Sequence, residues 1–169
     1  ETEILEVLSE RAAGTLAAGF GRLKVTERVV GFERKRTHGL EVIDRQPLDL
    51  PPVVYETQGL WLRAPAAAAE ALESAGGKLL GSLHAVEHAA IGLLPLFTIC
   101  DRWDVGGVST PIQTETGLPT IVVYDGYPGG AGIAELGYAS ADRHLQATLE
   151  VIAACRCAEG CPSCVQSPK

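Results

Sequence analysis

The sequence lacks a start methionine, an N-terminal signal and a long hydrophobic run. Its first residue is Glu1, and no basic stretch precedes an apolar one, so we expect no secretory signal and a piece of a longer protein. The most apolar stretch, residues 89–100, contains Pro95 and has 12 residues, whereas a helix that crosses a bilayer needs about 20. These absences predict no membrane helix and a cytoplasmic location.

Basic side chains are also scarce. The chain has 14 Lys and Arg against 21 Asp and Glu, a net charge of −7, which disfavours a nucleic-acid binder that works through bulk charge. The charge is uneven, however, because residues 21–46 carry a net +3 and the rest carry −10. Phosphate contacts need cations, so Arg34, Lys35 and Arg36 are the predicted contacts to the phosphates of any nucleic acid that binds. A solvated charged hairpin is the alternative.

The composition has the balance of a globular protein, with 46% hydrophobic and 21% charged residues. This balance argues against intrinsic disorder, collagen-like repeats and low-complexity sequence. Domains usually have about 100 to 200 residues, and no internal repeat or long linker divides this chain of 169 residues. We therefore expect a single domain over residues 1–169.

The first third of the chain predicts one helix and a set of strands. Apolar residues recur at helical spacing over residues 2–18, and glycines follow, so we expect an amphipathic helix there. The runs 23–30, 39–43 and 53–63 are rich in Val, Thr and aromatic residues and are separated by Gly and Pro. They predict a small antiparallel sheet.

The middle of the chain is predicted to contain two helices and a turn-rich stretch. Residues 65–75 begin at proline and end before a glycine pair, as helices commonly do. Residues 79–94 are apolar around most of the circumference, which predicts a central helix buried on nearly all sides. Several glycines and aspartates in residues 101–107 then predict turns.

The last third is predicted to hold one strand and two helices. Residues 119–125 read PTIVVYD, a pattern typical of a buried strand. Helices are expected over residues 131–139 and 141–154, the second of which runs into a cysteine cluster. A strand-rich front and a helix-rich back predict an α+β fold, in which a small antiparallel sheet packs with several helices.

Four of the five cysteines fall within ten residues, in the pattern C-x-C-x3-C-x2-C, at Cys155, Cys157, Cys161 and Cys164. Zinc prefers four thiolate or imidazole ligands in a tetrahedron, and a chain folds around one ion only where tight turns separate the ligands. Gly160 and Pro162 supply such turns. The pattern predicts a structural Zn²⁺ site, closed by its ligands and without a catalytic role.

Two other interpretations of the cysteine cluster stay open. Disulfides between cysteines two or three residues apart would close small, strained loops, and no secretory signal is visible. Cys161 and Cys164 also have the C-x-x-C spacing of redox motifs, although such motifs normally follow a strand in a βαβ unit. Cys100, the fifth cysteine, is predicted to be a thiol of the core.

A second candidate site is the segment from His84 to His88, which matches H-x-x-E-H, the inverted zinc-protease motif. In that motif two histidines on one helix face bind zinc, and the glutamate, here Glu87, acts as a base. A metal-dependent hydrolase is therefore the alternative function. The other interpretations are a polar cluster inside a buried helix, bonded to loops such as residues 101–107, and a polar contact to another domain or to a ligand.

Residues 125–136, DGYPGGAGIAEL, form a glycine-rich loop that opens a helix. Such a geometry can bind an anion on free backbone amides, but the loop matches neither common nucleotide-binding pattern and has no lysine for a phosphate. We therefore expect a sharp structural turn. Local sequence signals no ATP site and no Ser-His-Asp or Cys-His arrangement, so no catalytic residue is predicted.

Five segments, taken in order, form a recognisable series. They are LPPVVYETQGLWL at residues 50–62, then HAVEHA, CDRWDVGG, YDGYPGGAG and CRCAEGCPSCVQSPK. The series resembles the zinc-binding C-terminal domain of superfamily 2 DNA helicases of the mitomycin repair factor A type. The resemblance extends from about Gly21 to the end of the chain.

This resemblance implies a non-catalytic accessory domain behind two motor domains of the same polypeptide, in a helicase that acts in DNA repair. ATP and Mg²⁺ would be used only by those motor domains, which translocate on single-stranded DNA. The resemblance also implies one structural Zn²⁺ held by Cys155, Cys157, Cys161 and Cys164. Family members usually continue with another cysteine directly after a stretch such as SPK, and that cysteine would compete for the fourth ligand position.

Overall fold

The centre of the computed structural model, which describes residues 1–39, 41–162, 164 and 165, is an antiparallel sheet in the order β1-β2-β5-β7-β6. Every pair of neighbours in it runs antiparallel. Its strands are β1 (Thr2–Ala13), β2 (Leu16–Glu27), β5 (Val53–Arg63), β6 (Val105–Thr110) and β7 (Thr120–Asp125). The buried strand predicted at 119–125 is β7, and its six residues are all buried.

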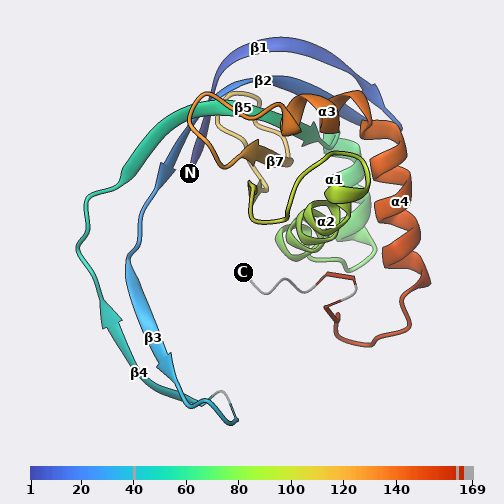
Figure 1. Ribbon diagram of the computed structural model, residues 1–169. Coiled ribbons are helices and arrows are strands. Elements are labelled where there is room, and N and C mark those ends of the chain that lie inside the picture. Colours follow the sequence, from blue (N-terminus) through green and yellow to red (C-terminus); the bar gives the residue numbers. More distant parts are fainter. Residues whose placement is uncertain (40, 163, 166–169) are drawn as a thin grey trace.

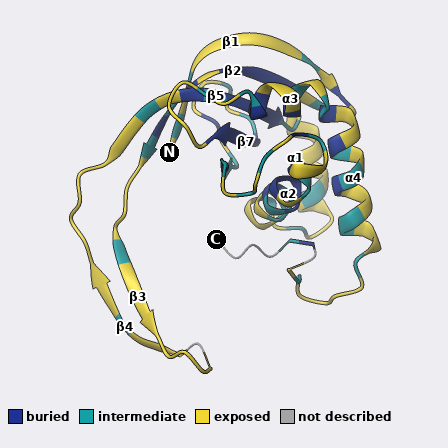
Figure 2. Cartoon of the chain, viewed as in Figure 1, coloured by how far each residue is buried: buried dark blue, intermediate teal, exposed yellow. Residues whose placement is uncertain are grey.

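Beyond this sheet, β2 and β5 continue into a two-stranded ribbon, which we call the arm. It consists of β3 (Gly31–Lys35) and β4 (Val42–Pro47), paired antiparallel. Figure 1 shows the arm curving away from the body and back toward the helices, so that arm and body together form an arch. Most of its residues are exposed, as the colouring in Figure 2 shows.

Among the described residues, four α-helices and one short 3₁₀ helix complete the fold. They are α1 (Ala66–Ser74), α2 (Leu79–Leu93), the 3₁₀ helix Leu94–Leu96, α3 (Ile133–Ala139) and α4 (Ala141–Ala154). The helix layer packs on one face of the sheet, where α2 contacts β6 and β7, and α3 contacts β2 and β5. The sheet and helices confirm the predicted α+β class, and the helices start and end within two residues of their predicted bounds.

Strand alternation divides the core between the two faces of the sheet. Leu60 and Val123 point to the helix face and join residues of α2 and α3 in the larger cluster. Trp61 and Tyr124, their neighbours in sequence, point to the second face and pack with residues of β2. β7 and the second half of β5 are therefore buried on both faces, which is why β7 reads as a continuous apolar run.

The helix predicted over residues 2–18 is wrong. These residues form β1 and the start of β2, joined at Gly14, whose φ of 58° is left-handed. The pairing of β1 with β2 shifts register between Ile4 and Glu6 and again between Val7 and Ser9. Such bulges interrupt the two-residue alternation of a strand, and the resulting spacing of apolar residues imitates the period of a helix.

The turn predicted over residues 101–107 is wrong in its last part, because Gly106 and Gly107 belong to β6. A Cβ atom at Gly106 would lie 2.4 Å from the ring of Tyr124, and one at Gly107 would lie 2.8 Å from Oε1 of Glu87. Glycine is required here because side chains of neighbouring elements cross the strand on both faces.

Helix α2 is not buried on nearly all sides, contrary to the prediction. Its buried residues are Glu87, Ala89, Ala90 and Ile91, whereas Leu80 and His84 are exposed. The helix contacts β6, β7, α1 and α4, and these neighbours still leave several of its residues exposed. Residues Leu79–Leu96 have the length and hydropathy of a membrane span, and a third of them are buried inside the fold.

The junction between β7 and α3 depends on one buried carboxylate. Asp125 is fully buried at the end of β7, and its side chain accepts hydrogen bonds from the backbone N–H groups of Ala131 (2.5 Å), Ile133 (3.3 Å) and Ala134 (2.8 Å). The glycine-rich loop between them reverses direction through left-handed residues that include Gly132, which precedes α3. The loop is the sharp structural turn that the sequence predicts, and its backbone N–H groups already have an acceptor in the Asp125 side chain.

Replacing Asp125 by Ala should lower the free energy of unfolding by about 3 kcal/mol, because three backbone donors lose their shared acceptor in a buried site. Urea denaturation monitored by far-UV circular dichroism measures the change. Asp49→Ala, at an exposed position before β5, is the matched control and should stay within about 0.5 kcal/mol of the parent. Equal stabilities of the two variants would contradict this role for Asp125.

Candidate metal centre

The four clustered cysteines come together directly after α4. Their sulfur atoms all lie within 4.8 Å of one another. The Sγ–Sγ distances are 3.3 Å for Cys155–Cys157, 3.5 Å for Cys157–Cys164, and 3.6 Å for both Cys155–Cys161 and Cys161–Cys164. With Zn–S bonds of about 2.3 Å, the edge of a tetrahedron of sulfur atoms is roughly 3.8 Å. The four thiols therefore fit one tetrahedral ion closely.

The backbone arranges these sulfur atoms through a short turn. Gly160 has a φ of 83°, as expected for the turn predicted there. The N–H of Cys164 donates to the carbonyl of Cys161 over 3.0 Å, and the N–H of Cys161 donates to Sγ of Cys164 over 3.2 Å. A backbone donor aimed at a sulfur atom favours its thiolate form, which is the form that binds a metal.

The pKa values of the cluster differ strongly between its members. The backbone N–H of Cys161 is the main cause that lowers the pKa of Cys164 to about 7. Hydrogen bonds with Cys155 and then Cys164 raise the pKa of Cys157 to about 12. Because neighbouring thiolates repel one another, a bound cation is needed for all four to ionise at neutral pH. The donor set thus suits Zn²⁺.

The other two interpretations of the cysteines fit the geometry less well. The shortest Sγ–Sγ distance is 3.3 Å, well beyond the disulfide bond length of about 2.05 Å. The C-x-x-C pair lies in a loop that follows a helix, not a strand of a βαβ unit. Cys100 lies apart from the cluster, packs against the main core and is 3.0 Å from Oγ1 of Thr98, as predicted for a core thiol.

We call the segment after α4 that carries the four clustered cysteines the cysteine loop. The side chains of His84, Glu87 and His88 meet on the side of α2 that faces β6 and this loop. Oε2 of the buried Glu87 accepts a hydrogen bond from Oγ of Ser109 over 2.6 Å and lies 3.2 Å from Nδ1 of His84. Nδ1 of His88 donates to the carbonyl of Val165 over 3.0 Å. This arrangement ties α2 to β6 at one point and to the cysteine loop at another.

The predicted partners of this cluster, loops such as residues 101–107, are therefore wrong. Ser109 belongs to β6, a strand that the predicted elements do not include, and Val165 directly follows the last clustered cysteine. The ligand atoms of the two histidines and Glu87 lie within 4.8 Å of one another, close enough to share an ion. The carboxylate that a hydrolase needs as its base is 5% exposed and already hydrogen-bonded, which fits a structural polar cluster.

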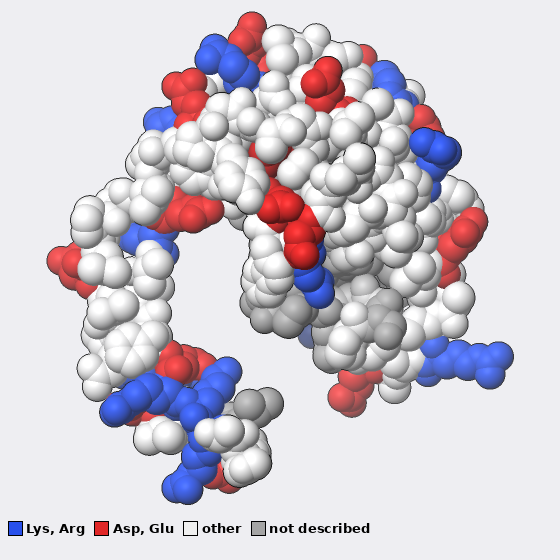
Figure 3. All heavy atoms as spheres, in the orientation of Figure 1, with Lys and Arg blue, Asp and Glu red and all other residues white. Residues whose placement is uncertain are grey.

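The three predicted DNA contacts lie at the far end of the arm. Each cation is exposed and ion-paired within the arm: Arg34 with Asp44, Lys35 with Glu33, and Arg36 with Glu41. These pairs cause opposite shifts in Arg34 and Asp44, whose pKa values are raised and lowered by their shared hydrogen bond. Figure 3 shows the basic side chains gathered at this end of the arm.

A sheet with a helix layer on one face, followed by four cysteine sulfur atoms close enough to share one ion, has the features of a zinc-binding domain. Residues 86–165 match the family described as the MrfA Zn-binding domain. The chain belongs to this family.

Known proteins and a solved structure are similar to this chain in sequence and fold. The chain is 31% identical over 166 residues to the ATP-dependent helicase YprA of Bacillus subtilis, a match that covers 98% of this chain and 22% of YprA. It is 39% identical over 90 residues to protein MJ1572.1 of Methanocaldococcus jannaschii, covering 52% of this chain and 80% of that protein. The crystal structure of the DUF1998 helicase MrfA bound to DNA superposes with a TM-score of 0.73 at 29% identity, over 99% of this chain and 22% of MrfA. The chain thus spans about a fifth of the helicases it matches.

Glu87→Ala should lower the free energy of unfolding by about 1 to 3 kcal/mol, because Ser109 and His84 lose a buried partner. Thermal and urea unfolding of the zinc-loaded chain measure this change. Glu73→Ala, at an exposed position on α1, is the matched control and should be nearly neutral. A Glu87→Ala variant that kept its stability but lost a zinc-dependent peptidase activity would contradict the structural role and support a hydrolase.

Proposed function

We propose that this chain is the zinc-stabilised accessory domain of an ATP-dependent DNA helicase and is not itself an enzyme. The observation that carries the proposal is the tetrahedral cluster of four cysteine sulfurs, in a chain that aligns over 98% of its length with 22% of a helicase. Residues 1–169 form one domain in this proposal. The motor domains, with their ATP and Mg²⁺, belong to the remainder of the polypeptide, and the whole helicase acts in DNA repair in the cytoplasm.

Cys155, Cys157, Cys161 and Cys164 are the ligands in this proposal. When bound, Zn²⁺ supplies a dication that neutralises the thiolates and stabilises a segment too short to build a core. Cys155 follows α4 directly, so the first ligand is anchored to the helix layer. At the other end of the cluster, His88 holds the carbonyl of Val165 against α2. The cysteine loop is therefore fastened to two helices, and its metal serves to keep them in place.

Cys161→Ser and Cys164→Ser should each lose most of the zinc, because a hydroxyl binds the ion far more weakly than a thiolate. The measurement is metal content per chain after gel filtration, for which the parent should hold about one equivalent. Cys100→Ser is the matched control, since this thiol lies in the core, away from the cluster. Full zinc content in both cluster variants would refute this ligand set and favour a different fourth ligand.

We further propose that Arg34, Lys35 and Arg36 contact the phosphates of single-stranded DNA. Support comes from their position at the exposed end of the arm, whereas the body of the chain is acidic. Their ion pairs are on the surface, where a pair contributes about 0 to 1 kcal/mol. A phosphate can therefore replace the carboxylate partner at little cost. The DNA-bound MrfA structure, which superposes on 99% of this chain, adds support.

Replacing Arg34, Lys35 and Arg36 together by Ala in the full-length helicase should weaken single-strand binding. Each lost phosphate contact lowers the slope of log affinity against log salt by about 0.7, so the slope should fall by up to about 2. Fluorescence anisotropy with a labelled oligonucleotide at several salt concentrations measures both effects. The control is Arg22→Ala with Lys24→Ala, two cations that are ion-paired on the body. An unchanged slope in the triple variant would contradict the DNA contact and support the alternative, in which the arm is a solvated charged hairpin.

The alternative function, a metal-dependent hydrolase on His84, Glu87 and His88, has weaker support. Its motif and the proximity of its ligand atoms favour a shared ion. However, such an enzyme needs a metal-bound water and a free base in an open cleft. Glu87 is buried between α2 and β6 and is hydrogen-bonded to Ser109, so the accessory domain remains the better-supported function.

A further inference from the structure

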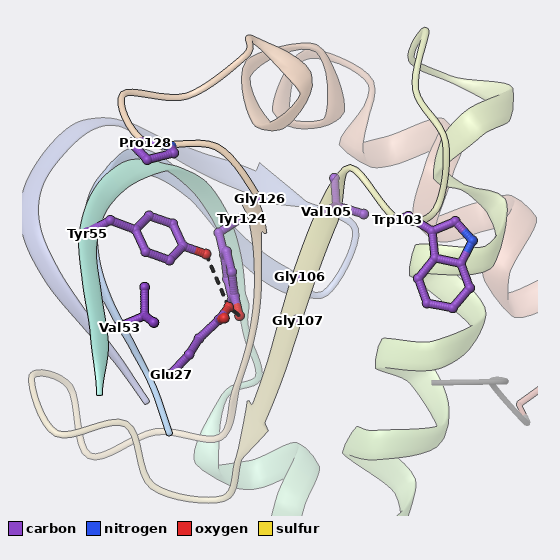
Figure 4. A pocket seen from close by; sticks show the side chains of 10 residues that line it. All are labelled: Glu27, Val53, Tyr55, Trp103, Val105, Gly106, Gly107, Tyr124, Gly126 and Pro128. Atoms are coloured by element: carbon purple, nitrogen blue, oxygen red, sulfur yellow. Dashed lines mark hydrogen bonds between the residues drawn. The ribbon is translucent and has the colours of Figure 1, made fainter. Parts of the chain in front are cut away.

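A cavity on the second face of the sheet has no role in the zinc site or the proposed DNA contact. It has a volume of about 550 Å³ and lies where β5 separates from β7, since the two strands are paired only from Gly59 onward. Figure 4 shows its walls, which come from the end of β2, the start of β5, the end of β7, β6 with the turn before it, and the glycine-rich loop. The lining residues are Glu27, Val53, Tyr55, Trp103, Val105, Gly106, Gly107, Tyr124, Gly126 and Pro128.

One carboxylate and two phenol rings form the polar end of this cavity. Oε1 of Glu27 accepts hydrogen bonds from the hydroxyl of Tyr55 over 3.2 Å and from that of Tyr124 over 3.5 Å. Figure 4 shows both tyrosine side chains directed toward this carboxylate. Burial, followed by the charge of Glu27, raises the pKa of Tyr55 to about 12 and also raises that of Tyr124. Both phenols therefore stay protonated and donate at neutral pH.

Both hydroxyl contacts go to the same oxygen of Glu27. No donor from the described part of the chain is recorded on the other oxygen, Oε2, and the Glu27 side chain is exposed. The ring of Tyr124 has room to lie across β6 only because Gly106 lacks a side chain, since a Cβ atom there would be 2.4 Å from the ring. The cavity thus presents one carboxylate oxygen to a ligand beside aromatic surface.

The charge of the cavity selects the class of ligand. Among the described residues that line it, none is Lys, Arg or His and the charged one is Glu27, so a phosphate or carboxylate would meet the negative charge of Glu27. Figure 3 shows acidic side chains along the inner side of the arch, between the arm and the body. A cation is therefore attracted to this side of the molecule, and the phosphates of a nucleic acid are repelled.

We propose that this cavity binds the arginine side chain of a protein segment that crosses the inner side of the arch. A guanidinium is planar, donates from two nitrogens at once to a carboxylate, and stacks on aromatic rings. Glu27 supplies the carboxylate, and Tyr55 and Tyr124 supply the rings. Three of the segments in the helicase-like series meet here, because Tyr55 belongs to VVYETQGLWL, Gly106 to CDRWDVGG and Tyr124 to YDGYPGGAG.

The probe for this proposal is the peptide acetyl-Gly-Arg-Gly-amide, titrated up to about 20 mM into the isotope-labelled, zinc-loaded chain. Two-dimensional NMR should show saturable shifts of resonances from Tyr55, Gly106 and Tyr124. The same peptide with citrulline, which has the shape of arginine without its charge, should bind about tenfold more weakly. Equal binding of the two peptides, or no saturable shift with arginine, would overturn the proposal.

Two variants distinguish the effect of the Glu27 carboxylate on arginine binding from the effect of any negative charge on the surface. Glu27→Gln keeps an acceptor for both tyrosines and should weaken binding of the arginine peptide about tenfold at unchanged melting temperature. Glu56→Gln, an exposed glutamate of β5 that is ion-paired with Arg22, is the matched control and should bind as the parent does. Affinity unchanged by Glu27→Gln would refute the site. A thymidine trinucleotide that shifts the same resonances, while the arginine peptide does not, would also refute it and indicate base stacking.

Discussion

The Asp125 carboxylate is the constraint on which the rest of the structure depends. It lies fully buried at the end of β7, between the strands and the helices, and holds three backbone N–H groups at the start of α3. Helix α4 follows α3 almost immediately, and Cys155 follows α4. The position of Cys155 relative to the sheet is therefore set by one carboxylate and two consecutive helices. Thr57 strengthens the same junction, because its hydroxyl lies within hydrogen-bonding distance of the carbonyls of Asp125 and Tyr127.

The cysteine loop is attached to the helix layer, and the arm is attached to the sheet. The loop is fastened to the helix layer through Cys155 and through the bond from His88 to Val165. The arm is an extension of β2 and β5, whose eleven paired positions run without a register shift from Ala17 and Arg63 to Glu27 and Val53. A two-stranded ribbon is marginally stable alone, so the long β2–β5 pairing is what supports it. The cysteine loop is thus held against the helices, whereas the exposed ribbon extends away from the body.

Several glycines of the sheet leave space for large side chains that pack against the strands. A Cβ atom at Gly19 would lie 2.1 Å from the indole of Trp61, and one at Gly106 would lie 2.4 Å from the ring of Tyr124. Gly107 makes the same allowance on the helix face for Glu87. The buried polar cluster and the Glu27 cavity therefore depend on two adjacent glycines of β6, one for each face. Gly106 and Gly107 are adjacent in β6, so the segment 101–107, whose sequence is typical of a turn, contains two residues on which both sites depend.

By itself, the sequence determined the α+β class, the four helices after residue 64, the buried strand β7 and the cysteine cluster, because each depends on neighbours in the chain: caps, apolar period, or ligands within ten residues. Only the tertiary structure decided that residues 2–13 pair as a bulged edge strand, since bulges hide the alternation that would have revealed it. Only the fold brought Ser109 to Glu87 and Val165 to His88, 22 and 77 residues apart. The cavity of Glu27, Tyr55 and Tyr124 likewise joins three distant segments, because sheet order, which local sequence does not encode, sets which strands become neighbours.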